Sequence, residues 1–194
     1  MADNEIGAKS FWASYGSLIS DGRIVIVPGG GIFADAVREA QSTVAFDDAA
    51  AHHMALLAMD QYALTLKSLQ PRLTTAASEL EISERSWQHR AIVWMPSKMV
   101  LADDAIPRNW SVTSDSLAAW LAHKINASRL VLVKHDEAIE SEAPLEQLVR
   151  SGVLDAAFLD FADGLTCPIH VVGKTGHAEF DMALSGGLLP TRAF

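Results

Sequence analysis

The stretch "IVIVPGGGIFADAVREAQ", from Ile24 to Gln41, decides how this chain folds. It opens with a short run of branched apolar residues, which is typical of a strand that is buried on both faces. Three consecutive glycines, Gly29, Gly30 and Gly31, then lead into an amphipathic segment that predicts a helix at 33–41. A strand, a tight loop and a helix in this order form the basic unit of an α/β protein.

The same alternation continues along the rest of the chain. The predicted strands are 23–27, 91–95, 130–133 and 169–172, with a further short one at 73–76, and the predicted helices are 6–19, 33–41, 46–69, 79–90, 114–125 and 144–150. We therefore expect an α/β fold, an αβα sandwich with a mostly parallel central sheet. We expect one domain over residues 1–194, with all four main strands in one sheet.

Composition narrows the classes of protein that fit. The chain has 15 Lys and Arg against 24 Asp and Glu, a formal net charge of −9, so nucleic acid is not expected as a partner. It has a single cysteine, Cys167, so no disulfide can form within it. We find neither a signal peptide nor an apolar run that is long enough for a membrane span, and expect a soluble, cytoplasmic protein.

The glycine loop is the first candidate site. In parallel sheets, ligands bind at the carboxyl ends of the strands, which is where Gly29, Gly30 and Gly31 lie. Glycine lets a ligand approach the backbone, and the free N–H groups at the start of a helix suit a phosphate. The alternative is a tight turn without a ligand. The loop matches neither the dinucleotide-binding spacing nor a P-loop, because no GK[ST] follows it.

Two further segments carry polar residues at predicted strand or helix ends. In "TSDSLAAWLA", Thr113, Ser114 and Asp115 stand at the entrance of a helix, where Thr113 or Ser114 can also serve as a simple N-cap. The candidates beyond two later strands are Lys134, Asp136, Gly173 and Lys174. A lysine such as Lys174 can reach a phosphate or a purine, but it fits an ordinary surface residue equally well.

The long predicted helix 46–69 contains His52, His53 and Asp60. Asp48 and His52 share a helix face, which suggests an ion pair more than a metal site, because no third ligand is evident. We therefore expect no bound metal here. Either histidine can contact a substrate phosphate, and Asp60 can contact an ammonium. The helix is apolar around most of its circumference, so we also expect a homodimer or larger assembly.

Four segments of the chain resemble a known family. The segment "VIVPGGGIFADAVR" looks like the second glycine-rich segment of the amino acid kinase superfamily. The stretches "DDAAAHHMALLAMDQYALTL", "WSVTSDSLAAWLA" and "RLVLVKH" are similar to its aminomethylfuran phosphate kinase branch, which acts in methanofuran or methylofuran biosynthesis and one-carbon metabolism. The resemblance covers residues 23–172.

The resemblance implies an ATP- and Mg²⁺-dependent kinase that phosphorylates a phosphate-bearing small molecule such as aminomethylfuran phosphate. It implies that Asp115 organises the catalytic site and that Lys134 assists there. It places Lys134 and Asp136 near the nucleotide, and Gly173 and Lys174 are further candidates for nucleotide contacts.

The chain departs from the superfamily pattern in two places. It reads "KHDE" where the superfamily usually has a "DVDG"-like segment, and it lacks the opening "KxGGS" strand whose lysine neutralises phosphoryl charge. Three explanations stay open: a truncated start, a catalytically silent nucleotide- or phosphate-binding relative or regulatory partner, and a lysine supplied from elsewhere. We expect the 194-residue chain to be a poor kinase.

Overall fold

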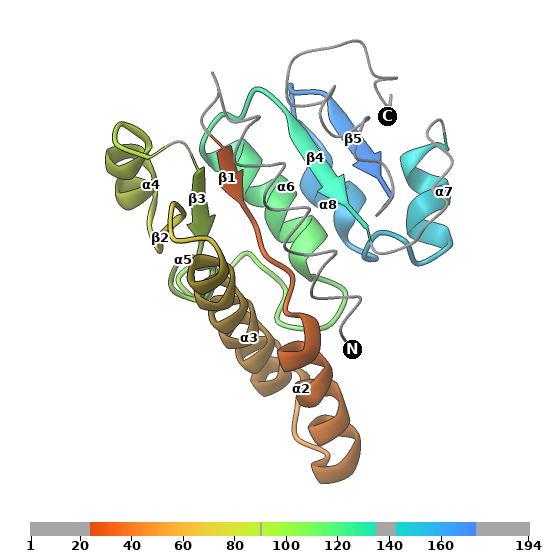
Figure 1. The fold of residues 1–194 in the computed structure, drawn as a ribbon. Coiled ribbons are helices and arrows are strands. Elements are labelled where there is room, and N and C mark those ends of the chain that lie inside the picture. The colour runs from red at the N-terminus through yellow and green to blue at the C-terminus, as the bar shows by residue number, and fades with distance from the viewer. Residues whose placement is uncertain (1–23, 90, 135–142, 174–194) are drawn as a thin grey trace. The chain divides into compact units, whose positions relative to one another are not determined.

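The structure, a computed structural model, describes residues 24–89, 91–134 and 143–173 (Figure 1). The chain divides into two compact units, Met1–Asn109 and Trp110–Phe194, and each is described by itself. The expected helix at 6–19, Asp136 and Lys174 lie outside the described residues.

Unit 1 is built on a three-stranded parallel sheet. Its strands are β1 (Ile24–Ile26), β2 (Thr74–Ala76) and β3 (Ala91–Trp94), in the spatial order β1-β3-β2. The central strand β3 is buried along its whole length, as its continuous apolar sequence predicts. Parallel pairing brings the carboxyl ends of all three strands to the same edge of the sheet.

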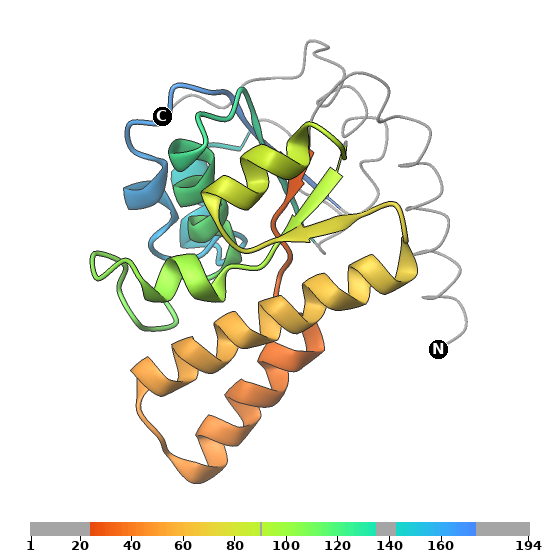
Figure 2. The same cartoon turned by 90° about the vertical axis from the view of Figure 1, so that its left-hand side faces the viewer.

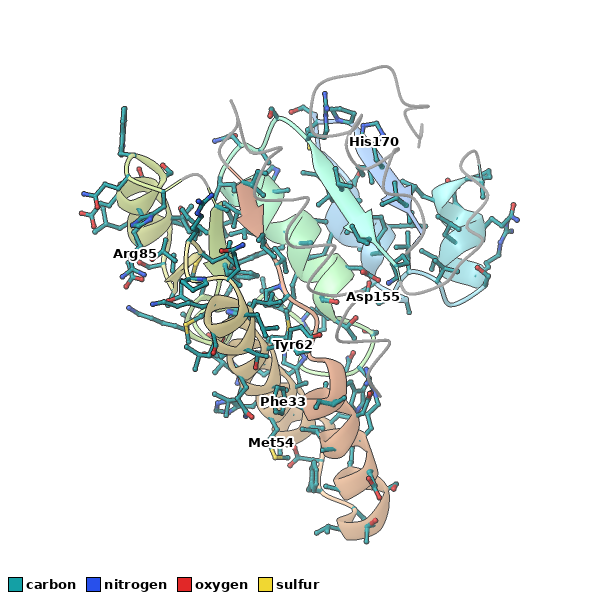
Figure 3. All side chains as sticks on the ribbon, in the orientation of Figure 1. Phe33, Met54, Tyr62, Arg85, Asp155 and His170 are labelled. Carbon is teal, nitrogen blue, oxygen red and sulfur yellow. The ribbon has the colours of Figure 1, made fainter. Side chains whose placement is uncertain are left out.

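Four helices accompany this sheet: α2 (Gly31–Val44), α3 (Asp48–Leu69), α4 (Glu79–Ser86) and α5 (Ser97–Leu101). The C-terminal part of α3 packs on the sheet, where Ala63 and Leu66 join Leu73, Ala91 and Val93 in a buried cluster. Helix α2 lies beside the N-terminal half of α3 (Figure 2). Phe33 of α2 and Tyr62 of α3 meet edge to face, with ring centroids 6.4 Å apart (Figure 3).

Unit 2 contains a two-stranded parallel sheet of β4 (Leu130–Val133) and β5 (Ile169–Val172), with the helices α6 (Ser114–Lys124), α7 (Leu145–Arg150) and α8 (Phe158–Ala162). Helix α6 packs against α8 and β4 and buries most of its residues. Its buried residues include both small and large apolar side chains, Leu117, Ala118, Ala119 and Leu121, so it can be enclosed on more than one face.

The predicted α/β class with parallel strands is confirmed. The expectation of one sheet was wrong for the described residues, in which the strands hydrogen-bond as two sheets, one in each unit. An apolar run indicates a buried strand, but which strand pairs with it depends on contacts between distant residues. The prediction of a single domain stays a prediction. Within the described ranges, no helix is both long and apolar enough to cross a membrane.

Candidate functional site

The strongest polar cluster of unit 2 joins α6 to the end of β4. Asp115 lies in the first turn of α6 and is only 7% exposed. Lys134 directly follows β4, and its N–H group donates to the Val172 carbonyl at 2.9 Å, which extends the strand ladder by one residue. Its Nζ lies 2.7 Å from Asp115 Oδ2, and both side chains are largely buried. The two residues predicted to be catalytic are therefore in direct contact.

A second acid, Asp155, completes this cluster. Asp155 lies between α7 and α8 and is labelled in Figure 3. Its Oδ2 accepts hydrogen bonds from the Thr113 N–H at 2.7 Å, the Thr113 hydroxyl at 2.8 Å and the Ser116 N–H at 3.2 Å. Its Oδ1 accepts from the Ser116 hydroxyl at 2.7 Å. The cap of α6 is thus Asp155 and not the side chain of Thr113 or Ser114.

Burial raises the pKa of the Asp115 carboxyl above its ordinary value, because ionisation is less favourable away from water. The Lys134 ammonium opposes this effect by its charge and its hydrogen bond, while the nearby Asp155 carboxylate raises the pKa further. The Asp155 backbone N–H donates to Asp115 Oδ2 at 3.3 Å and stabilises the ionised form. Lys134 is therefore the main group that favours a charged Asp115.

Backbone conformation and close packing explain why two residues of the glycine loop of unit 1 are glycines. Gly31 has a φ of +50°, and a Cβ there would lie 2.6 Å from the Tyr62 ring. A Cβ on Gly30 would lie 2.4 Å from the Ala34 Cβ. Gly29 is exposed and has no positive φ. The tight-turn explanation therefore accounts for Gly30 and Gly31, and it leaves Gly29 unexplained.

The start of α2 also differs from the starts of the other long helices in the described residues. Side-chain acceptors cap three of them: Asp47 for α3, Ser78 for α4 and Asp155 for α6. The N-cap of α2, Gly30, has no side chain, and within the described ranges the N–H groups from Gly29 to Phe33 find no acceptor. These N–H groups come shortly after the carboxyl end of β1, at a helix start of the kind that can bind an anion.

Asp60 supports the start of α5. Its carboxylate accepts hydrogen bonds from the Ser97 N–H at 3.3 Å and from the Ser97 hydroxyl. Ser97 opens α5 just beyond the end of β3. Asp60 therefore lies near the edge of the sheet where ligands of α/β proteins bind, but it is already hydrogen-bonded within unit 1.

The two histidines of α3 have different surroundings. His53 is exposed, whereas His52 is only 4% exposed, and its Nδ1 lies 3.3 Å from the Asn109 carbonyl oxygen. Burial lowers the pKa of His52, and the Asn109 carbonyl opposes this shift. Its Nε2 is buried without a hydrogen-bond partner among the described residues. His52 and Asp60 are about 12 Å apart along the helix axis, so α3 does not bring them together.

The remaining predicted residues add little to the described clusters. Ser114 is the first residue of α6, and Gly173 directly follows β5. No group of three or more His, Cys, Asp or Glu residues that could hold a metal ion occurs in the described part of the chain. Sequence reasoning missed Asp155, because it stands in the unremarkable stretch "VLDAAF" and meets Thr113 and Ser116 only through the fold.

The fold and these clusters define an α/β protein whose polar groups gather where parallel strands end. The model of the "Amino acid kinase family" matches residues 2–147. This match covers more than half of the chain, which therefore belongs to the amino acid kinase family.

Two relatives illustrate this membership. The chain is 23% identical over 122 residues to a [5-(aminomethyl)furan-3-yl]methyl phosphate kinase from Methanocaldococcus jannaschii. This alignment spans 63% of the chain and 56% of that relative. The crystal structure of uridylate kinase from Archaeoglobus fulgidus is similar in fold, with a TM-score of 0.68 and 17% identity over 92% of this chain and 88% of that one. The family match confirms the predicted resemblance to the amino acid kinase superfamily, and the uridylate kinase structure agrees with it in fold.

Proposed function

We propose that this protein is a small-molecule kinase that transfers a phosphoryl group from ATP to a phosphate-bearing acceptor. The observation that carries the proposal is the 2.7 Å contact between Lys134 and Asp115 in a largely buried position. Phosphoryl transfer requires little covalent chemistry from a protein, but it requires fixed charges around the migrating group. A lysine held in place by an aspartate is a group of this kind.

Lys134 has the chemistry to bind nucleotide phosphates. One of its three N–H donors is directed at Asp115, and the others can donate to phosphate oxygens. Asp115 retains Oδ1, which accepts no hydrogen bond from the described residues. The described residues contain no group of three or more His, Cys, Asp or Glu residues that could hold a metal ion. Mg²⁺ would therefore be bound mainly through the nucleotide, as is usual for this ion, and would neutralise phosphate charge.

The free N–H groups of the glycine loop support binding of a phosphate in unit 1. The other long described helices carry a side-chain acceptor at their start, so α2 is the one whose first turn has donors left for a ligand. We assign Gly29, Gly30 and Gly31 to a substrate phosphate. An acceptor phosphate is already an anionic nucleophile, so the chemistry needs no general base.

Aminomethylfuran phosphate is the acceptor that we propose, because the Methanocaldococcus relative is named as a kinase of this compound. The chain aligns with little more than half of that relative. The acceptor therefore needs a direct test. Asp60 and His53 are candidates to contact the amine and the phosphate of such a molecule.

The test measures ADP release by the 194-residue chain with ATP, Mg²⁺ and aminomethylfuran phosphate. The matched control acceptor is the same furan with a free hydroxyl in place of its phosphate. We expect slow release that depends on the phosphorylated acceptor and is lost with the control. ATP binding by calorimetry without acceptor-dependent release would favour a silent nucleotide-binding relative, and absence of ATP binding would overturn the proposal.

A further inference from the structure

The start of α6 is held by a residue that is distant in the chain. Asp155 accepts four hydrogen bonds from Thr113 and Ser116, the residues on either side of the Ser114–Asp115 pair. Nearby, the Ala157 N–H donates to the Ser111 carbonyl at 3.0 Å. The segment 155–157, just before α8, is therefore hydrogen-bonded to the backbone on both sides of Asp115.

Asp155 also contacts Asp115 directly. Its N–H donates to Asp115 Oδ2 at 3.3 Å, and the same oxygen receives Lys134 Nζ at 2.7 Å. One residue thus holds the backbone of the first α6 turn with its side chain and the Asp115 carboxylate with its main chain. Asp115 cannot shift toward or away from Lys134 without disturbing these bonds.

We propose that Asp155 is a positioning residue for phosphoryl transfer, which orients Asp115 and, through it, Lys134. This inference rests on the kinase function proposed above. Both Asp155 oxygens are engaged by donors of α6, so its carboxylate acts through the helix and not on the substrate. It also occupies the positive end of α6, which leaves that helix start unavailable to a substrate phosphate.

Two variants separate the charge of Asp155 from its hydrogen bonds. In Asp155→Asn, the amide oxygen can accept the three bonds that Oδ2 now accepts, and the amide NH₂ can donate to the Ser116 hydroxyl. Asp155→Ala removes all four bonds. The matched control is Asp47→Ala, because Asp47 likewise caps a helix, α3 in unit 1, through a 2.7 Å bond from the Ala50 N–H.

Loss of a residue that only stabilises the helix and loss of a residue that positions Asp115 should affect the kinetics of the enzyme differently. At a temperature at which each variant is folded, we expect Asp155→Ala to lower kcat by on the order of 10²-fold with a smaller change in KM. Asp155→Asn should retain most of this activity, and Asp47→Ala should match the original chain. Equal kcat values for Asp155→Ala and Asp47→Ala would overturn the proposal.

A second readout does not depend on turnover. NMR titration of the Asp115 carboxyl, assigned by comparison with Asp115→Asn, reports whether Asp155 acts on it. Because the Asp155 carboxylate raises the Asp115 pKa, we expect this pKa to fall in Asp155→Asn. An unchanged pKa would overturn the coupling even if the protein is active. If the Asp115 pKa falls as expected in a protein that shows no turnover, the coupling between Asp155 and Asp115 is supported and the proposed kinase function is not.

Discussion

Lys134 Nζ lies 2.7 Å from Asp115 Oδ2, although 19 positions separate the two residues in the chain. One residue follows β4 and the other begins α6, so the fold of unit 2 creates the pair.

Replacing Lys134 by methionine keeps most of the side-chain length and removes the charge. We expect kcat to fall by on the order of 10²- to 10³-fold, as for other losses of a fixed group that meets developing charge. Steady-state ADP release measures the change. Lys67→Met, at an exposed position of α3, is the matched control. Similar rates for both variants would show that the catalytic cation lies elsewhere in the chain.

Replacing Asp115 by asparagine should change how stability depends on pH. The folded chain holds the Asp115 proton more tightly than the unfolded chain does, since burial raises this pKa. Ionisation of Asp115 therefore lowers the free energy of unfolding as pH rises from the ordinary Asp value through the raised one. We expect the original chain to lose stability relative to Asp115→Asn over this window, with a constant difference above it.

Urea unfolding of both proteins at a series of pH values measures this difference, because the other titrating groups are common to the two. A difference that changes in the opposite direction would mean that Lys134 outweighs burial and lowers the pKa.

Replacements in the glycine loop should separate folding from phosphate binding. Gly31→Ala should lower the free energy of unfolding by about 1–3 kcal/mol, because of its positive φ and the nearby Tyr62 ring. Gly29→Ala should leave stability nearly unchanged and weaken the binding of inorganic phosphate, because a methyl group then stands at the free N–H groups. Chemical unfolding and calorimetry measure the two effects. Unchanged phosphate affinity in Gly29→Ala would contradict the assignment of the loop.

The exposed apolar face of α3 should form a contact between subunits. Leu57 and Leu64 are 43% and 53% exposed and lie seven residues apart, so they share a helix face. We expect light scattering to report a mass above the 20.9 kDa of one chain, and Leu57→Glu with Leu64→Glu to reduce it to that value. Leu80→Glu, at an exposed leucine of α4, is the control. A monomeric original chain would refute this prediction.

Local sequence patterns predicted most helices and strands. The β-branched runs became β1, β3, β4 and β5, and the 46–69 segment became α3, with Asp47 as its cap. The short helices α5 and α8 were not predicted, because five residues carry too little periodicity to stand out. The pairing of the strands into two sheets was not predicted either, because the sequence of an apolar strand does not show which other strand pairs with it.

The sequence by itself determined the α/β class, the glycine loop at the end of β1 and the identity of Asp115 and Lys134 as candidate residues. The fold class and the loop depend on short-range periodicity and on residue types at strand ends, which are visible along the chain. The roles expected of Asp115 and Lys134 came from the resemblance of their motifs to the amino acid kinase superfamily. Only the tertiary structure decided that Asp155 caps α6 and contacts Asp115, and that Asp60 supports α5. Such contacts join residues that are dozens of positions apart, so their geometry exists only after the helices and strands have packed.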